Sequence, residues 1–337
     1  MARPYGLLRC GFPFAKSLGM RRLTNYPIDV ALGDEERIYV LCRADNAALV
    51  RKYNYDDEDL GAFGSMGKGD GQFMWPVSVI TDSEENVYVS DEYLNRISVF
   101  DREGEFKGNW GESGNDPGQL DHASGIAFDA EENVYVSDTM NHRVQKFTKD
   151  GEYIAAFGEH GSDKGQLNMP WGIDVDDEGA VYVADWRNDR IQKFSADGEF
   201  IAKFGGSGCG DGEFNRPVDV TVDDDGDIYV ADWGNDRVQM FNSDTRYVQK
   251  FLGDATLSKI AREYMLTNAM PNRLRDMANI ELQKFLRRPK SVTISGDGRL
   301  FIADNQSYRL QVYQKEVIHL TPEQYGPPMR SPTLNQE

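Results

Sequence analysis

Short runs in which apolar and polar residues alternate recur along the chain, and turns rich in Gly and Asp separate them. In one stretch these runs cover residues 172–175, 180–184, 190–194 and 199–204. An alternation with a period of two is the pattern of a half-buried β-strand. Strands of about five residues at spacings of about 8–12 residues are typical of antiparallel all-β proteins. The pattern therefore predicts an all-β protein.

The strand pattern is itself repeated. Four copies begin at Met74, Asp121, Asn168 and Asn215, so successive copies start 47 residues apart. Two more divergent copies begin at Asn25 and Arg288. A unit of about 40–50 residues with four strands, here lettered a to d, is typical of one β-propeller blade. Six units predict one ring-shaped domain, a six-bladed β-propeller of four-stranded antiparallel blades.

The ends of the chain determine how this ring closes. The sixth unit shows only three strands, so residues 5–12 or residues 316–320 are expected to supply its fourth strand. We expect residues 1–24 to close the last blade, residues 25–320 to form the propeller, and residues 321–337 to be a flexible tail. The tail is polar and rich in Pro, a composition that favours disorder unless it is bound.

Two sequence phrases characterise the units. Strand b ends in Tyr-Val-Ala/Ser-Asp, followed by Asn and then Arg-Val/Ile-Gln-x-Phe, and the units are joined by phrases such as FGEHGSDKGQLNMP and FGGSGCGDGEFNRP. Both phrases resemble NHL repeats over about residues 25–314. The resemblance implies a six-bladed propeller, but a fold does not specify an activity.

An Asp at the end of strand b and an Arg five residues later recur in five units. The pairs are Asp91/Arg96, Asp138/Arg143, Asp185/Arg190, Asp232/Arg237 and Asp304/Arg309. Five copies around a ring cannot form one active site. We therefore expect each Asp to accept turn N–H groups and to pair with its Arg. The first unit departs from this pattern, because Cys42 replaces the Asp and Arg43 follows it.

The formal charge of −19, from 37 basic and 56 acidic residues, argues against binding to a nucleic-acid backbone. The six a–b turns hold 17 carboxylates and two basic residues, so one face of the ring is expected to be acidic and solvated. A calcium site at Asp223, Asp225 and Asp227 is disfavoured, because no turn has a full EF-hand loop. Three unpaired cysteines, no apolar run of about 18 residues and no signal-peptide pattern favour a cytoplasmic protein.

The b–c loops and the d–a connections are expected on the opposite face, with four of the five Trp residues. Aromatic and Arg side chains on an exposed rim favour a partner-binding surface. The candidate residues are Trp75, Tyr93, Trp171, Trp186, Arg187, Arg216, Trp233, Arg287, Arg288 and Lys290. Trp75 and Trp171 could instead pack between blades, whereas Trp186 and Trp233 are expected to be exposed.

An insertion at residues 254–288 separates the fifth unit from the sixth and carries a net charge of +3. Its apolar spacing predicts two helices divided at Pro271. Such an insertion could cover the channel mouth, could dock a partner, or could simply pack on the rim.

The channel mouth offers the alternative chemistry. Asp29 and Asp219 could ligate a divalent cation or act as acid and base. The other mouth candidates are Asn25, Tyr26, His122, Asn168 and Asn215. The resemblance also implies a comparison with a three-histidine zinc lyase of the NHL-like family. Of the four histidines here only His122 is placed at the mouth, so the zinc site is not supported.

Two functions follow from these patterns. The first is a non-enzymatic binding or scaffold propeller that presents its aromatic, Arg-rich face and its insert to a protein partner or an anionic ligand, or serves as a subunit of a larger assembly. The alternative is a divalent-metal-dependent hydrolase or lyase at the channel mouth. The sequence indicates no cofactor apart from that divalent cation, and the channel could also take a small-molecule ligand.

Overall fold

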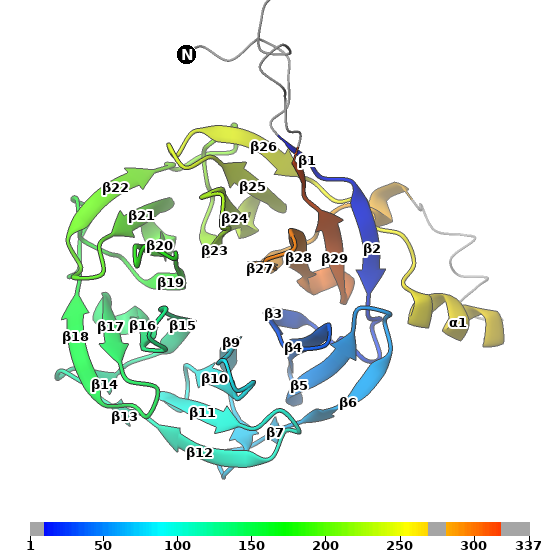
Figure 1. The fold of residues 1–337 in the computed structure, drawn as a ribbon, viewed down its shortest axis with the longest axis horizontal. Helices are drawn as coiled ribbons and strands as arrows, with labels where there is room; N and C mark the ends of the chain where they lie inside the picture. The colour runs from blue at the N-terminus through cyan, green and yellow to red at the C-terminus, as the bar shows by residue number, and fades with distance from the viewer. Residues whose placement is uncertain (1–9, 269–280, 318–337) are drawn as a thin grey trace, which may run out of the picture.

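The computed structural model describes residues 10–268 and 281–317. Six four-stranded antiparallel sheets stand around one central axis, with strand a of each blade innermost and strand d at the rim (Figure 1). From the channel outward, the first blade consists of β3 (Pro27–Leu32), β4 (Arg37–Ala44), β5 (Ala47–Asn54) and β6 (Asp59–Phe63), and the second of β9 (Pro76–Thr81), β10 (Val87–Asp91), β11 (Arg96–Phe100) and β12 (Phe106–Trp110). The third blade consists of β15 (Ala123–Phe128), β16 (Val134–Asp138), β17 (Arg143–Phe147) and β18 (Tyr153–Phe157), and the fourth of β19 (Pro170–Val175), β20 (Val181–Asp185), β21 (Arg190–Phe194) and β22 (Phe200–Phe204). The fifth blade consists of β23 (Pro217–Val222), β24 (Ile228–Asp232), β25 (Arg237–Phe241) and β26 (Tyr247–Phe251), and the sixth of β27 (Pro289–Ile294), β28 (Arg299–Asp304), β29 (Arg309–Gln314) and β2 (Phe14–Leu18).

The outer strand of the sixth blade comes from the N-terminal region. It is β2, which pairs antiparallel with β29. Neither candidate strand for this position was right, because β2 begins after residues 5–12, and the described part of 316–320 pairs elsewhere. That part is β30 (Glu316–Val317), which forms a two-residue ladder with β1 (Cys10–Gly11). Two further short pairs are parallel and lie in d–a connections: β7 (Ser65–Met66) with β8 (Gln72–Phe73), and β13 (Glu112–Ser113) with β14 (Gln119–Leu120).

The core lies between neighbouring blades. The Tyr-Val pattern of strand b buries side chains on both faces of each sheet, so each blade contributes to two interfaces. At the ring closure, fully buried Leu18 of β2 packs in one cluster with Val40 and Tyr53 of the first blade and Phe301 of the sixth. Burying a Leu side chain contributes about 2 kcal/mol, so this strand stabilises the joint between the two ends of the chain.

The inner strands approach one another closely at two glycines. A Cβ atom at Gly125 would lie 2.3 Å from the carbonyl oxygen of Trp171, and one at Gly172 would lie 2.5 Å from Cα of Asp219. Because no real Cβ atom tolerates such distances from backbone, these positions require Gly. The inner strands of the third, fourth and fifth blades therefore pack directly against one another.

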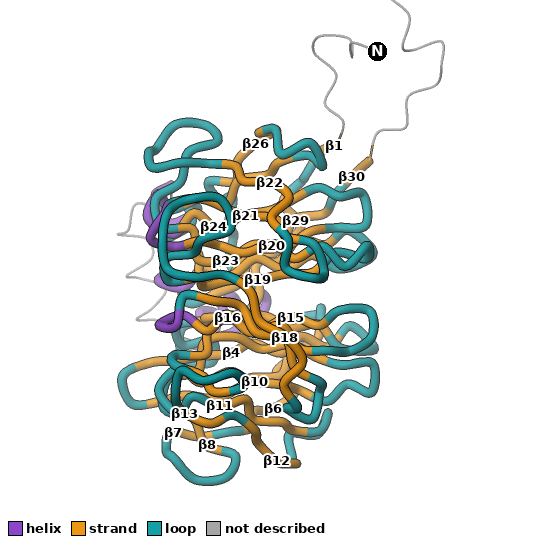
Figure 2. The backbone as a smooth tube through the Cα atoms, turned by 90° about the vertical axis from the view of Figure 1, so that its left-hand side faces the viewer, coloured by secondary structure: helices purple, strands orange, loops and turns teal. Residues whose placement is uncertain are grey.

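The helices are short and gather on one side of the disc (Figure 2). Four 3-10 turns follow strand b of their blades, namely η1 (Thr139–Asn141), η2 (Trp186–Asn188), η3 (Trp233–Asn235) and η5 (Asn305–Ser307), and η4 (Glu281–Gln283) lies in the insertion. Within the described residues no helix is both long and apolar enough to cross a membrane.

The insertion contains one described α-helix, α1 (Lys259–Thr267), and the second expected helix lies outside the described residues. The Ser258 hydroxyl caps α1 by accepting from Ala261 N, and it donates to the carbonyl of Gly19 next to β2. The amide of Ile260 donates to Asp57. Consequently α1 lies at the outer rim beside β2 and does not cover the channel mouth (Figure 1).

Candidate functional site

The repeated Asp organises the turn between strands b and c. In the fourth blade, Asp185 Oδ1 accepts from the amide of Asn168 at 2.7 Å, and Oδ2 accepts from Arg190 Nε at 2.7 Å and Asn188 Nδ2 at 2.8 Å. The same carboxylate–guanidinium pair forms in the third, fifth and sixth blades. These observations confirm the structural interpretation in four blades, because both oxygens of each Asp are engaged by turn groups.

The second blade departs from this rule. Asp91 accepts from the amides of Met74, Trp75 and Leu94, while Arg96 donates to the carbonyls of Gly69 and Gln72. Both residues are described, yet no ion pair joins Arg96 to Asp91, so the expected pair is wrong here. The residue three positions after the Asp is Leu94 in this blade, whereas it is Asn in the third to fifth blades. Leu has no side-chain donor, so Asp91 accepts from backbone amides instead.

The residue before strand a has a left-handed backbone in five blades. These residues are Tyr26, His122, Met169, Arg216 and Arg288, with φ between 52° and 59°. The amide of Arg216 donates to Asp189 of the preceding turn, and that of Arg288 donates to Asp236, both at 2.7 Å. Such φ values are unfavourable for large side chains and persist only where neighbouring bonds fix them. The bonds hold Arg216 and Arg288 over the neighbouring Trp side chains.

We call this side of the ring the tryptophan face, defined by Trp75, Trp171, Trp186 and Trp233. The guanidinium of Arg216 lies 4.9 Å from the ring centroid of Trp186, and that of Arg288 lies 4.3 Å from Trp233. Trp171 and Trp186 contact each other with centroids 5.8 Å apart. The ring quadrupole of indole attracts such cations.

The exposure of the four Trp residues differs from expectation. Trp75 is 47% exposed, whereas Trp171, Trp186 and Trp233 are half-buried against the core between the fifth and sixth blades. The expectation that Trp186 and Trp233 would be the exposed members is thus only partly right. Packing holds three indoles rigidly, and their remaining surface faces solvent.

Lys290 is at the centre of the tryptophan face. Its ammonium lies 5.1 Å from the centroid of Trp233 and 5.9 Å from that of Trp171. It lines a small cavity at the channel mouth together with Arg43, Trp171 and Asp219. The pKa of Lys290 is lowered to about 8, first by burial and then by the positive charges of Arg43 and Arg288, while the carboxylate of Glu92 opposes this shift. Burial also lowers the pKa of Arg43 and raises that of Glu92.

The cations of this mouth have few acidic partners. Among the described residues, no carboxylate lies within 4.0 Å of the charged nitrogens of Lys290, Arg43, Arg187 or Arg216. The nearest to an ion pair is Arg288, whose Nε lies 3.9 Å from Asp236. Arg187 lies 5.2 Å from the centroid of Trp186. A chain with a net charge of −19 thus leaves a group of positive charges uncompensated at one place.

Arg43 and Glu92 were missed as mouth residues. In the first blade a tight turn between Ala44 and Ala47 replaces the Asp-centred loop. Arg43 is thereby free to donate to the carbonyl of Pro76 at 3.1 Å and to lie 4.2 Å from the centroid of Trp75. The signal was the broken repeat at Cys42, a buried thiol whose pKa burial raises to about 12.

Five of the predicted mouth residues, and the partner-binding candidates Tyr93 and Arg287, do not line the small cavity. Tyr26 contacts Tyr308 at 4.7 Å between centroids, and His122 Nδ1 lies 2.7 Å from Asp121 Oδ1. Tyr93 is exposed beneath the ammonium of Lys68. The rest contribute backbone groups to turns or lie at the rim: Asn25, Asn168, Asn215 and Arg287. None of these seven residues lines the described mouth cavity.

Three carboxylates lie deeper in the channel. Each accepts an amide N–H from the inner strand of the next blade: Asp29 from Val79, Asp174 from Val222 and Asp219 from Val292, at 2.8–2.9 Å. Burial raises the pKa of Asp29 and of Asp174 to about 6. Burial and the charge of Asp29 raise the pKa of Asp219 well above its ordinary value. The three line one cavity of about 290 Å³.

These contacts bear on the predicted metal pair, Asp29 and Asp219. Both side chains face the same channel, as expected. Asp29 is already saturated, because Oδ1 accepts from Val30 N while Oδ2 accepts from Ser78 Oγ and Val79 N. The sequence analysis missed Asp174, because it is four residues after its Pro whereas Asp29 and Asp219 are two residues after theirs.

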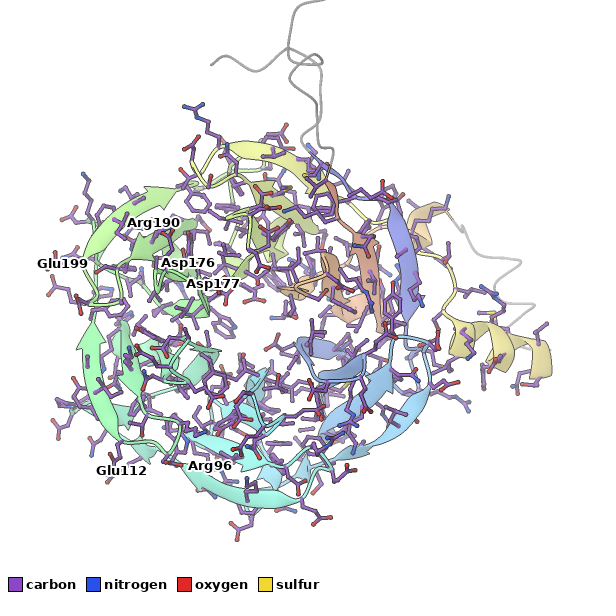
Figure 3. The ribbon with its side chains drawn as sticks, viewed as in Figure 1. Arg96, Glu112, Asp176, Asp177, Arg190 and Glu199 are labelled. Atoms are coloured by element: carbon purple, nitrogen blue, oxygen red, sulfur yellow. The ribbon has the colours of Figure 1, made fainter. Side chains whose placement is uncertain are left out.

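The a–b turns form the acidic face, on the other side of the ring. Figure 3 shows Asp177 of one such turn beside the central opening and Glu199 at the outer rim. On this face the carboxylates of Asp223, Asp225 and Asp227 lie within 4.8 Å of one another, a spacing that could hold a metal ion. The ammonium of Lys315 lies between them, at 2.5, 2.8 and 3.0 Å. A lysine thus supplies the positive charge of this cluster.

Comparison with known proteins supports the architecture. The family model described as NHL repeat matches residues 120–147, 167–194 and 214–241. No curated protein gives a significant sequence match. Similar solved structures include virginiamycin B lyase from Staphylococcus aureus, with a TM-score of 0.58, 13% identity, and coverage of 90% of this chain and 99% of that one. Another is a protein of unknown function from Bacteroides thetaiotaomicron, with a TM-score of 0.59, 17% identity, and coverage of 91% and 72%. The WD40 propeller domain of Doa1 has a TM-score of 0.56, 12% identity, and coverage of 94% and 100%. At these identities the likeness extends to the fold alone.

Proposed function

The chain is an NHL-repeat six-bladed β-propeller, and from this premise we propose that it is a non-enzymatic binding protein whose tryptophan face takes an acidic segment of a protein partner. The observation that carries the proposal is the group of cations at the channel mouth, which lie on indole rings and of which only Arg288 has a carboxylate within 4.0 Å among the described residues. Indole and guanidinium groups dominate the energy of many protein interfaces. The guanidiniums of Arg216 and Arg288 already rest on Trp186 and Trp233, so less side-chain entropy is lost when a partner binds.

The charge distribution supports an anionic partner over a neutral one. The net charge of −19 would repel an acidic peptide from much of the surface, whereas the mouth gathers several described cations without a carboxylate within 4.0 Å. An acidic segment would therefore be guided to this mouth, and its on-rate should fall as salt increases. Because α1 lies at the outer rim, we assign the partner to the mouth and not to α1.

Intrinsic fluorescence gives a direct test, because four of the five Trp residues are on this face. A variant with Trp110→Phe removes the remaining indole and provides the reference protein. A glutamate-rich peptide should change its fluorescence saturably, and a lysine-rich peptide should not. In the reference background, Arg216→Gln with Arg288→Gln should weaken the peptide affinity by at least about 10-fold, corresponding to about 1.4 kcal/mol.

The folded state of each variant is checked by circular dichroism and thermal unfolding. An unchanged affinity in the folded double variant would remove the basis of this proposal. So would an affinity that does not fall between about 0.05 and 0.5 M salt, because screening at these concentrations should weaken exposed charge pairs.

The alternative is a metal-dependent hydrolase or lyase at Asp29 and Asp219. Its support is that both carboxylates face one channel with raised pKa values. Metal analysis of the purified protein and thermal unfolding with added Mg²⁺, Ca²⁺ or Mn²⁺ distinguish the two functions. A stoichiometric metal lost in Asp219→Asn would favour the enzyme. The location in the cytoplasm stays a prediction that three free thiols support.

A further inference from the structure

Among the described residues, the amine of Lys290 has no hydrogen-bond partner. Its ammonium lies against the rings of Trp171 and Trp233, and no described acceptor lies within hydrogen-bond distance of Nζ. Lys290 is partly buried, and the two indole rings take the place of water and of oxygen acceptors on part of the amine, which makes its charged form more costly. The surroundings of Lys290 therefore suit a neutral amine better than a charged one.

The charged groups around the amine act in both directions, and burial with the two guanidiniums outweighs the carboxylate. Arg43 and Arg288 repel a positive charge at Nζ, and only Glu92 on the same mouth attracts one. Deeper in the cavity, Asp29 and Asp219 also face this space. Desolvation beside like charges is the usual way in which a protein makes a lysine amine nucleophilic near neutral pH.

The cavity limits what can reach this amine. Its volume of about 20 Å³ is enough for about one water molecule, so a single carbonyl group can enter while the rest of a ligand stays at the surface. Arg43 lines this cavity and has no described carboxylate within 4.0 Å, and the charge of Arg288 also acts on the amine although its Nε lies 3.9 Å from Asp236. The two guanidiniums would hold an anionic group of that ligand.

We propose that Lys290 forms a reversible imine with a small aldehyde or 2-oxo acid that carries a carboxylate group. This covalent chemistry goes beyond the binding of an acidic partner and does not depend on it. The lone pair of neutral Nζ attacks the carbonyl carbon, the carbonyl oxygen takes a proton from solvent, and the nitrogen releases one of its two protons to solvent. The resulting carbinolamine loses its hydroxyl and the remaining nitrogen proton as water, leaving a C=N bond. One carbonyl compound and one amine give one imine and one water, with no oxidant or reductant.

Glyoxylate is a suitable probe, because it is the smallest compound with both an aldehyde and a carboxylate. The full-length protein is incubated with glyoxylate and cyanoborohydride at pH 7.5, and the modified residues are identified by peptide mapping. At a pKa near 8 roughly a quarter of the amine is neutral, against about 0.1% for an ordinary lysine. A less basic amine is also a weaker nucleophile, which offsets part of this advantage. Lys290 should therefore react on the order of 10-fold faster than exposed Lys203.

Two controls separate a built site from general lysine reactivity. Lys290→Arg keeps the positive charge and should abolish the rapid modification while all other sites are unchanged. Arg43→Gln should reduce the preference for glyoxylate over an uncharged aldehyde such as glycolaldehyde. Modification of Lys290 no faster than that of Lys203 would overturn the proposal.

A second measurement does not require any variant. Competitive labelling with acetic anhydride between pH 6 and 10 reports the titration of each amine in the intact protein. The rate at Lys290 should level off above about pH 8. A rate that still rises steeply at pH 10 would show an ordinary ammonium and would also overturn the proposal. Neither labelling result bears on the affinity for a glutamate-rich peptide, so the two proposals can fail separately.

Discussion

Two lysines on opposite faces of the ring show how one side chain serves two purposes. Lys315, on the acidic face, is surrounded by the carboxylates of Asp223, Asp225 and Asp227, and they raise its pKa despite burial. Lys290, on the tryptophan face, has indoles and guanidiniums around it, and its pKa falls to about 8. The difference teaches that a neutralised buried cation stabilises a fold, whereas an uncompensated one is available for a ligand.

The largest expected effect is the loss of the neutralised lysine. In Lys315→Met, three carboxylates remain close together without a cation, and Asp227 is fully buried. Removing one partner of a buried ionic group costs about 3 kcal/mol, which urea unfolding at pH 7.5 would measure. Lys203→Met, a change at an exposed lysine, is the control.

The same variant should acquire a cation site. Millimolar Ca²⁺ should restore part of the lost stability of Lys315→Met and should leave the original protein nearly unchanged, because its own ammonium competes. If the variant unfolds at the same urea concentration as the original protein, Lys315 does not stabilise the acidic face.

The next largest effect is expected for Asp174, a carboxylate in the channel between the two faces. Asp174 has its pKa raised to about 6 by burial, so the folded state holds this proton more tightly than the unfolded chain does. Its contribution to stability is therefore present below about pH 4 and is lost as the pH rises through 6. Relative to Asp174→Asn, the original protein should gain about 2 kcal/mol between pH 7 and pH 4.5.

Thermal unfolding of both proteins across this range checks the difference, and the comparison cancels carboxylates common to both. A constant difference between the two proteins would mean that Asp174 titrates as an exposed carboxylate.

Replacing Lys290 should change the stability of the protein in the opposite direction from replacing Lys315. Lys290→Met leaves no partner behind and removes an unpaired ammonium, so at pH 7.5 the protein should be unchanged or more stable by about 1 kcal/mol. The lowered pKa has a second consequence. Between about pH 8 and pH 10 this lysine is deprotonated in the folded protein but still protonated in the unfolded chain. The original protein should therefore gain stability as the pH rises through this range, and the variant should not.

Urea unfolding at pH 7.5 and at pH 9.5 measures both effects. A loss of several kcal/mol in Lys290→Met would make Lys290 a structural residue like Lys315 and would remove the contrast between the faces.

The smallest expected effect concerns the turns that carry the tryptophan face. In the third blade His142 Nδ1 accepts from the amide of Met169 at 3.0 Å. At the same place in the fourth and fifth blades the acceptors are the carboxylates of Asp189 and Asp236. Burial and the neighbouring His160 lower the pKa of His142, so the original protein should lose stability as the pH falls below about 6.5. In His142→Asn the side chain still offers an oxygen acceptor but does not titrate, so this loss of stability at acid pH should disappear. We expect the loss in the original protein to be less than about 1 kcal/mol. Thermal unfolding at pH 7.5 and 5.5 is the check, and an equal acid loss in both proteins contradicts the assignment.

The repeat made most of the fold predictable. The 47-residue period, the Asp at the end of strand b and the Gly-rich joints are local features, and each is repeated in four or more units. Hydrogen bonds such as that from Arg190 to Asp185 lie within one unit, so the sequence of that unit suffices to predict them. The separation into an acidic and an aromatic face also follows from which turns lie on which side of an antiparallel blade.

The site was less predictable, because its contacts join different blades. Candidates such as His122 and Asn215 were placed at the mouth by their position in the repeat, yet they do not line the cavity. Arg43 does line it, and it is found where the repeat is broken. The short turn of the first blade frees its side chain, an effect of local geometry that no repeated pattern records.

By itself, the sequence determined the number of blades, their strands, the Asp-centred turns and the charge of each face. These features depend on alternation and on bonds within about 47 residues. The tertiary structure alone decided that β2 closes the ring, that α1 lies at the rim, and that Lys290 meets Trp171. It also brought Lys315 to carboxylates 88–92 residues away. The physical reason is that ring closure sets these contacts, and packing between blades then determines which charges are neutralised and which remain available.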